Sequence, residues 1–173
     1  MRKVVALILI LSLLVLPVRA ADNHKYVALT FDDGPSGKYT RALLDGLYDR
    51  GAKATFLLCG YRMTNYPDIT QRIFEEGHEI GYHGYNHQPL CLGNKDYMGI
   101  FDYKTWQDAA AMSKAFGHLT ELCDELFPDV DMAVYVPPSN LLSKEGEEFL
   151  AREYPHIKTI SGIYFDSLEV DFT

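Results

Sequence analysis

The stretch Y-V-A-L-T-F-D-D-G-P, residues 26–35, is the part of the sequence from which the fold is best inferred. Large apolar side chains alternate with alanine and threonine as far as Phe31, which is the pattern of a β-strand with one buried face. The alternation stops at two carboxylates, Asp32 and Asp33, and the Gly-Pro pair that follows predicts a turn. The sequence therefore predicts a strand that ends in two adjacent acidic residues.

Two carboxylates at the end of a strand can have different roles, because neighbouring side chains point in different directions. One of them could hold a cation while the other transfers a proton. The alternative is an ordinary acidic surface turn, and the Asp-Asp-Gly pattern alone favours that alternative because such residues are frequent in turns. A second group of polar residues, at 83–87, favours the functional interpretation.

Helices and strands alternate after the first strand. We expect a helix at residues 40–50, where three leucines share one face and Gly51 follows as a C-terminal cap. A short apolar strand is expected at 54–59, a second helix at 66–76 and a third strand at 78–83. This order indicates parallel strands joined by crossover helices, and hence an α/β fold.

The second half of the chain is expected to continue the same architecture. The segment 88–104 has no clear periodicity and is predicted to form a long loop near the site. The longest helix is predicted at 105–127, where apolar residues recur every three or four positions and Pro128 follows. Three further elements complete the prediction: a strand at 132–136, a helix at 143–154 capped by Ser143 and a strand at 157–160.

Two histidines, His83 and His87, follow the third predicted strand in the sequence H-G-Y-N-H. Functional groups of a parallel α/β sheet or barrel gather at the carboxyl ends of its strands, so both imidazoles should lie at the same edge as Asp32 and Asp33. Two histidines and one aspartate suit a divalent metal with positions left open for water. H-x-x-x-H alone is weak support for a metal site, but the carboxylates at a matching strand end favour one.

The first 20 residues have the features of a secretory signal peptide. Arg2 and Lys3 precede an apolar block at 4–16, and the small residues that follow predict cleavage after Ala20. The apolar block is short for a membrane span, so a membrane anchor is the less favoured alternative. Cleavage would leave residues 21–173 as a single secreted domain without a stable membrane anchor, long enough for a hydrophobic core but short for a closed eight-unit barrel.

The predicted mature chain is strongly acidic. The whole chain carries 16 basic and 24 acidic residues, and three of the basic residues lie in the predicted signal peptide, so the mature net charge would be −11. This charge argues against binding to nucleic acid and gives no attraction to an anionic membrane or wall polymer. Three widely spaced cysteines match no zinc motif and allow at most one internal disulfide, and the last is expected to be a buried thiol: Cys59, Cys91 and Cys123.

Three motifs resemble those of the polysaccharide deacetylases, also called the NodB-like homology domain or carbohydrate esterase family 4. They are T-F-D-D-G-P at 30–35, A-T-F at 54–56 and E-E-G-H-E-I-G-Y-H-G-Y-N-H at 75–87. The resemblance is strong over residues 26–89 and looser as far as residue 140. It implies a distorted β/α barrel with an open groove, and activity on an N- or O-acetylated polysaccharide such as peptidoglycan, chitin or xylan.

The resemblance also implies roles for four residues. Asp33, His83 and His87 correspond to the family's ligands for a divalent metal, commonly zinc or cobalt, and Asp32 corresponds to its general base. Such a metal lowers the pKa of bound water from about 15.7 to about 7, so that hydroxide can attack an acetamide carbonyl at neutral pH. The aromatic candidates for stacking on sugar rings, each of which could equally pack in the core, are Tyr82, Tyr85 and Trp106.

The sequence departs from the family pattern at several positions. Gly84 stands where the family usually has serine or threonine, so a hydroxyl that helps to fix the histidine loop is missing. Val136 stands where the family has an arginine that orients the base, and Ser139 stands where it has an aromatic residue. The later Asp-Trp and Leu-x-His motifs, the second of which provides the family's general acid, are not found before Thr173. The remaining histidines do not match that acid: His24, His78, His118 and His156.

These features support three interpretations of the chain. The first is a secreted metal-dependent hydrolase that removes acetyl groups from a polysaccharide. The second is a carbohydrate-binding pseudoenzyme that keeps the metal and the groove without turnover. The third is a fragment of a longer deacetylase, with a barrel that is incomplete at its C-terminus. The retained Asp32, which metal binding alone would not need, favours the first, whereas Val136 and the missing motifs favour the others.

Overall fold

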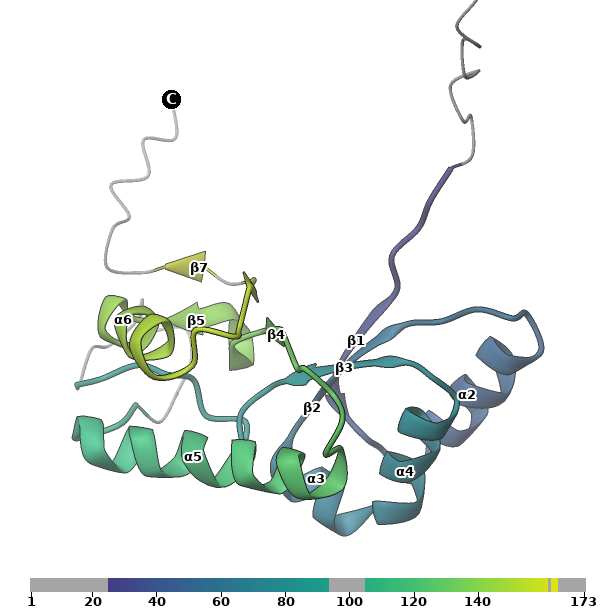
Figure 1. The fold of residues 1–173 in the computed structure, drawn as a ribbon, viewed down its shortest axis with the longest axis horizontal. Helices are drawn as coiled ribbons and strands as arrows, with labels where there is room; N and C mark the ends of the chain where they lie inside the picture. Colours follow the sequence, from purple (N-terminus) through teal and green to yellow (C-terminus); the bar gives the residue numbers. More distant parts are fainter. Residues whose placement is uncertain (1–24, 94–104, 162, 165–173) are drawn as a thin grey trace, which may run out of the picture.

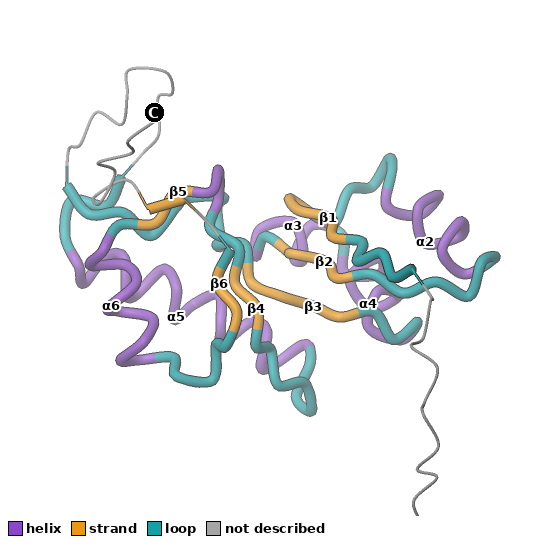
Figure 2. Tube along the Cα trace, turned by 90° about the horizontal axis from the view of Figure 1, so that it is seen from above, coloured by secondary structure: helices purple, strands orange, loops and turns teal. Residues whose placement is uncertain are grey.

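The structure is a computed structural model that describes residues 25–93, 105–161 and 163–164. Its central element is a five-stranded parallel sheet in the order β1-β2-β3-β4-β6 (Figures 1 and 2). The expected α/β fold with parallel strands is confirmed, and within the described residues these strands form an open sheet. The predicted signal peptide and residues 94–104 of the predicted loop lie outside the described part. The strands are β1 (Thr30–Gly34), β2 (Thr55–Leu58), β3 (Glu79–Tyr82), β4 (Val134–Tyr135) and β6 (Thr159–Ile160).

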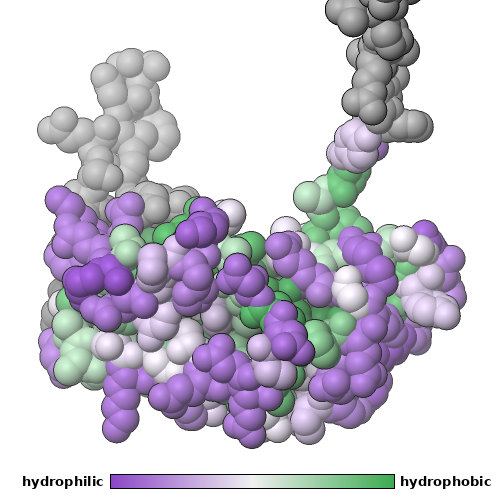
Figure 3. Space-filling model, in the orientation of Figure 1, coloured by the Kyte–Doolittle hydropathy of each residue, from purple (hydrophilic) through white to green (hydrophobic). Residues whose placement is uncertain are grey.

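The first strand begins later than the sequence predicted. β1 covers Thr30–Gly34 rather than residues 26–31, and it includes both aspartates. Val27 and Leu29 were expected on a half-buried strand but are 81% and 38% exposed. The alternation of residue types predicts a buried face that is absent here, because β1 is the end strand of the described sheet. Figure 3 shows exposed apolar surface on the segment that leads into β1.

Two helices pack against each other at the β1 end of the sheet (Figures 1 and 2). They are α2 (Thr40–Tyr48) and α4 (Pro67–Glu75), and both agree with the predicted helices to within a few residues. Gly51 and Gly77 follow them with positive φ values of 57° and 71°, as expected for C-terminal caps. A short helix, α3 (Gly60–Asn65), was not predicted because it is too short to show a helical period.

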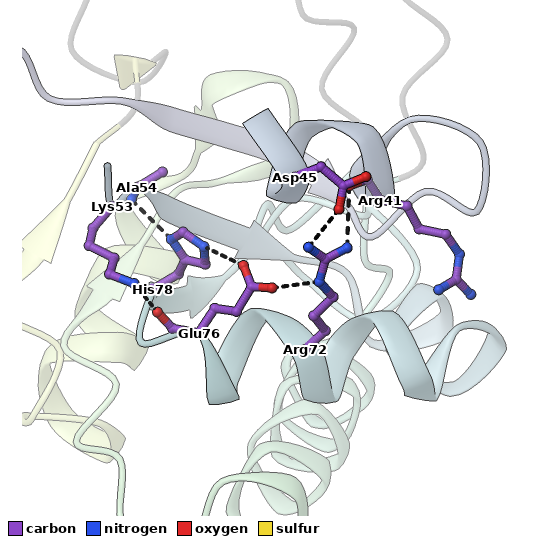
Figure 4. Close-up of polar contacts among 7 residues, drawn as sticks. All are labelled: Arg41, Asp45, Lys53, Ala54, Arg72, Glu76 and His78. Atoms are coloured by element: carbon purple, nitrogen blue, oxygen red, sulfur yellow. Dashed lines mark hydrogen bonds and ion pairs between the residues drawn. The ribbon is translucent and has the colours of Figure 1, made fainter. Parts of the chain in front are cut away.

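A polar network joins α2, α4 and the start of β3 (Figure 4). Arg72 donates hydrogen bonds to Asp45 (2.7 Å) and to Glu76 (2.6 Å). The ring of His78 is buried, and its Nδ1 accepts a hydrogen bond from the N–H of Ala54 (3.2 Å), which places the ring proton on Nε2, facing Glu76 at 3.6 Å. Burial lowers the pKa of His78. The role of His78 is therefore structural.

The longest helix, α5 (Ala109–Leu126), begins four residues later than predicted. Its start is set by Asp108, whose side chain accepts a hydrogen bond from the N–H of the third helical residue (2.7 Å). Trp106, two residues before Asp108, instead forms a β-bridge with Leu92, so the chain is extended there. The apolar face expected from the sequence is buried, and it consists of Met112, Phe116, Leu119 and Cys123.

The C-terminal part of the described chain is built from short elements. Helix α6 (Lys144–Glu153) is capped as predicted by Ser143, whose hydroxyl accepts a hydrogen bond from Gly146 (3.2 Å). The strands predicted at 132–136 and 157–160 are shorter in the structure, where β4 and β6 pair over two residues each. A further two-stranded sheet was not predicted, because strands of this length show no alternation, and it pairs β5 (Leu141–Leu142) with β7 (Ile163–Tyr164). Among the helices of the described chain, none is long and apolar enough to cross a membrane.

Candidate metal centre

The two aspartates lie in a bulge near the end of β1. Phe31 pairs with Phe56, whereas Gly34 pairs with Leu58, so three steps along β1 match two steps along β2. Asp33, inside this bulge, has a φ value of 64°, in the left-handed region that aspartate occupies more readily than most residues. Bulges bend a strand and redirect its side chains, and they are frequent next to functional sites. The direction of these carboxylates is therefore set by the bulge rather than by simple alternation.

The two histidines lie in a tight loop that follows β3. Gly84 and His87 have positive φ values of 74° and 54°, so the backbone turns sharply at both positions. The turns bring the rings of His83 and His87 to a centroid separation of 5.1 Å. The side chain of His83 is 3% exposed and that of His87 is 35% exposed. The loop thus presents one inner and one outer imidazole.

Asp33 lies between the two imidazoles. Its Oδ1 is 3.1 Å from Nε2 of His83 and 2.9 Å from Nε2 of His87. The three potential ligand atoms lie within 4.8 Å of one another. Ligand atoms at about 2.1 Å from a tetrahedral metal are about 3.4 Å apart, so small side-chain shifts would fit this cluster to an ion. The structure brings together the three residues that the sequence suggested as metal ligands.

The backbone carbonyl of Val136 fixes the orientation of His83. Its oxygen accepts a hydrogen bond from Nδ1 of the ring (2.7 Å), so the neutral imidazole has its lone pair on Nε2, facing Asp33. Two hydrogen-bond acceptors at 3.1 Å repel each other unless a proton or a metal ion lies between them. A divalent ion would satisfy all three ligand atoms at once, and zinc binds both imidazole nitrogen and carboxylate oxygen. The donor set therefore fits a divalent cation.

The segment that departs from the family's arginine motif lies against the histidine loop. A Cβ atom on Gly84 would be 3.1 Å from Cγ of Pro138, and the positive φ at this position also disfavours a side chain. Steric contact with Pro138 and the backbone conformation thus both favour glycine over serine or threonine at position 84 of this chain. Sequence reasoning missed the contribution of Val136, because it comes from a backbone carbonyl and such a group has no signal in the sequence.

Asp32 is exposed at the edge of the cluster. Within the described part of the chain, no residue forms a hydrogen bond or an ion pair with its carboxylate. The sequence placed Val136 where an orienting arginine would be, and the contact that Val136 makes is with His83. The carboxylate of Asp32 is therefore accessible to a ligand but weakly positioned.

Burial affects two groups next to the cluster. It lowers the pKa of His87, although the nearby carboxylate of Asp33 acts in the opposite direction. It also raises the pKa of the Cys59 thiol to about 12, and Asp33 adds to that increase. The outer imidazole is thus available as a neutral ligand, and Cys59 is a thiol rather than a thiolate. All three cysteines are buried, and none of them forms a disulfide with another described residue.

The aromatic candidates for sugar stacking fall into two groups. Tyr82 is 3% exposed and packs against Phe116 at a centroid distance of 5.7 Å, so of the two alternatives left open for it the structure shows core packing. Tyr85 is partly buried and stacks on His118, with centroids 4.4 Å apart and an interplanar angle of 22°. Tyr85, His118 and Trp106 all line a cavity of about 140 Å³ beside the histidine loop. Tyr85 and Trp106 remain candidates for contact with a ligand.

The parallel sheet, the bulged Asp-Asp strand end and the histidine loop define a domain of the polysaccharide deacetylase type, the NodB-like fold of carbohydrate esterase family 4. The chain belongs to a family described as uncharacterised protein conserved in bacteria (DUF2194), which it matches over residues 36–172. That match includes both histidines of the cluster and begins just after the aspartates.

The sequence is also similar to proteins that are named as polysaccharide deacetylases. A peptidoglycan-N-acetylglucosamine deacetylase from Bacillus cereus is 47% identical over 74 residues, which are 43% of this chain and 27% of that protein. A chitin deacetylase from Arthroderma benhamiae is 36% identical over 121 residues, 68% of this chain and 30% of that protein. The chain therefore spans less than a third of the length of these relatives.

Solved structures give a similar result. The peptidoglycan N-acetylglucosamine deacetylase Bc1960 matches with a TM-score of 0.63 and 26% identity, over 80% of this chain and 56% of that chain. A family 4 acetyl xylan esterase from Clostridium thermocellum, solved in complex with a cobalt ion, matches with a TM-score of 0.52 and 27% identity, over 66% of this chain and 49% of that chain. The shared fold thus corresponds to about half of each of these structures.

Proposed function

We propose that this protein is a metal-dependent hydrolase that removes acetyl groups from an N- or O-acetylated polysaccharide. The observation that carries the proposal is the convergence of ligand atoms from Asp33, His83 and His87 within 4.8 Å, next to the exposed Asp32. Relatives named as deacetylases of peptidoglycan and chitin, and a structural neighbour named as an acetyl xylan esterase, support the substrate class.

The proposed metal ligands are one carboxylate and two imidazoles, and the ion is expected to be zinc or cobalt. His83 would be the most rigid ligand, because it is buried and its Nδ1 is held by Val136. Asp33 and His87 are more exposed and would complete the site from the solvent side. A divalent ion held by these residues would lower the pKa of bound water and polarise a carbonyl oxygen.

Asp32 is the proposed general base. It neighbours Asp33 in the β1 bulge and is exposed, so it can accept a proton from a water molecule that attacks an acetyl carbonyl. A well-placed acid or base contributes about 10²–10⁴-fold to the rate. Because no described residue holds the carboxylate of Asp32 by a hydrogen bond or an ion pair, its contribution should lie at the lower end of this range.

A carbohydrate-binding pseudoenzyme is the second candidate. The weakly positioned Asp32 and the valine at position 136 favour it, since both would reduce turnover without affecting the metal ligands. Both candidates would bind a metal and an acetylated glycan such as peptidoglycan, chitin or xylan. They differ in whether acetate is released.

We further propose that the protein acts outside the cytoplasm as a secreted domain. Residues 1–20 carry the charged start, the apolar block and the small residues of a signal peptide. The peptidoglycan named for its relatives agrees with a location at the cell wall.

The deciding experiment measures acetate release from chitin oligomers and from peptidoglycan in the presence of zinc or cobalt. The enzyme hypothesis expects release by the parent protein, loss of release in Asp32→Asn, and no effect of Asp129→Asn, which removes another exposed carboxylate from the turn after α5. The pseudoenzyme hypothesis expects glycan binding without acetate. Metal content after dialysis is the second measurement, and a His83→Ala variant that keeps as much metal as the parent would show that the ligands are misassigned.

A further inference from the structure

Cys59 lies where the ends of three parallel strands meet. It follows β2 directly, and its backbone N–H donates a hydrogen bond to the carbonyl of Gly34 at the end of β1 (3.0 Å). It also precedes α3 as the N-terminal flanking residue of that helix. The side chain is 0% exposed, so it is sealed behind the metal cluster and does not belong to the group of potential ligand atoms.

The thiol of Cys59 contacts the backbone of one histidine ligand and faces the backbone of the other. Its S–H donates a hydrogen bond to the carbonyl of His83 (3.5 Å). The backbone of His87 faces the same sulfur and lowers the pKa of the thiol, against the larger effect of burial. These two backbone groups lie at the two ends of the loop 83–87. A single side chain therefore lies between the two ends of the loop that carries both imidazoles.

The residues after Cys59 hold the middle of the same loop. The N–H of Gly60 donates to the carbonyl of Gly84 (3.1 Å), and the N–H of Tyr61 donates to the carbonyl of Tyr85 (3.0 Å). The start of α3 thus supports the loop at several points, because backbone groups bind its middle and the thiol binds the carbonyl of His83 at its start. The loop needs such support, because two of its residues have positive φ and Gly84 has no side chain with which to brace it.

We propose that Cys59 is a positioning residue for the metal centre, whose thiol sets the spacing of the two imidazoles by bridging the His83 carbonyl and the His87 N–H. This inference rests on the proposed metal-binding function. A thiol suits the task because it can donate one hydrogen bond and accept another, whereas alanine or valine can do neither. Partners behind metal ligands typically change metal affinity by about 10–100-fold when they are removed.

The test compares variants of Cys59 with a matched variant of Cys123. Cys123 is also a buried free thiol, 2% exposed, but it lies in the core on α5. The dissociation constant for Co²⁺ is measured by competition with a chromophoric chelator, together with the urea midpoint of the metal-free protein. We expect Cys59→Ala to bind Co²⁺ at least about tenfold more weakly. Cys59→Ser should recover most of the affinity, and Cys123→Ala should lose stability without losing affinity.

Three results would overturn the inference. The first is parent-like affinity in Cys59→Ala, the second is an equal loss in Cys123→Ala, and the third is the same affinity in Cys59→Ser and Cys59→Ala. Hydrogen exchange of the His87 amide in the metal-free protein separates this inference from the proposed function. A parent protein that binds no metal refutes the proposed function. An unchanged hydrogen-exchange rate of the His87 amide in Cys59→Ala refutes the proposed bridge between Cys59 and His87.

Discussion

Replacing Gly60 by alanine should distort the metal centre without touching any metal ligand. A Cβ atom at this position would lie 2.2 Å from Cδ2 of the Tyr85 ring, with two more ring atoms at 2.8 and 2.9 Å. Carbon atoms that are not bonded pack at about 3.5–4.0 Å, so the ring would have to move by more than about 1 Å. Because this ring is stacked on His118, we expect the movement to reach the backbone of the loop 83–87.

The size of the effect follows from two opposing contributions. Overpacking a well-packed site costs about 1–3 kcal/mol. Alanine gains up to about 1 kcal/mol over glycine in a helix, which offsets part of that cost because Gly60 is the first residue of α3. We expect a net loss of about 1–2 kcal/mol in the free energy of unfolding. Metal sites tolerate deviations of about 0.2 Å in ligand distance, so metal affinity should fall at least about tenfold.

Chelator competition and urea unfolding measure the two effects separately. The matched control is Gly46→Ala in α2, where the nearest atom to the new Cβ is 3.6 Å away. That variant should be as stable as the parent or more so, with the same metal affinity. Parent-like metal affinity in Gly60→Ala would refute the reasoning, as would an equal loss of affinity in Gly46→Ala.

Three more predictions concern stability, processing and activity. Burial lowers the pKa of His78 below its unfolded value of about 6.5, so the unfolded state takes up the proton first. The contribution of His78 to the free energy of unfolding should therefore be fully present above about pH 6.5 and should decrease as the pH falls below that value. The free energy of unfolding in urea should then differ less between pH 7.5 and pH 5.5 in His78→Gln than in the parent. Mass spectrometry of exported protein should show an N-terminus at Ala21, and a full-length cytoplasmic chain would contradict the predicted cleavage. If amine expulsion lacks a general acid, acetate release should be faster from an aryl acetate than from an N-acetylated sugar oligomer, and the reverse order would point to an acid that has not been recognised.

The parts of the fold that were predicted correctly are those with a long and clear pattern. The helices at 40–50 and 66–76 have apolar residues at helical spacing, and both are followed by glycines at positions that need positive φ. The Asp33, His83 and His87 cluster was also foreseen, because the carboxyl ends of neighbouring parallel strands meet at one edge. In these cases the sequence pattern and the tertiary structure agree.

The predictions that failed depend on contacts between distant parts of the chain. The segment 26–29 alternates like a strand, yet its exposure is decided by what packs against it, which a local pattern does not contain. The bulge in β1 depends on how β1 pairs with β2, so no periodic pattern in the sequence of β1 alone predicts it. The bond from His83 to Val136 joins residues 53 positions apart through a backbone oxygen. The role of Tyr82 stayed open between sugar stacking and core packing, because an aromatic residue beside a site can equally belong to the core.

The placement of Asp33 opposite His83 also has a consequence for the lifetime of the folded chain. These residues are 50 positions apart in the sequence, and the ring of His83 is bound in turn to Val136, a further 53 positions away. An ion held between them would act as a reversible cross-link that exists in the native state alone. A ligand present at 100 times its dissociation constant stabilises the native state by about 2.7 kcal/mol. The concentration of free metal around the protein would then set its resistance to proteolysis, whether or not a substrate is present.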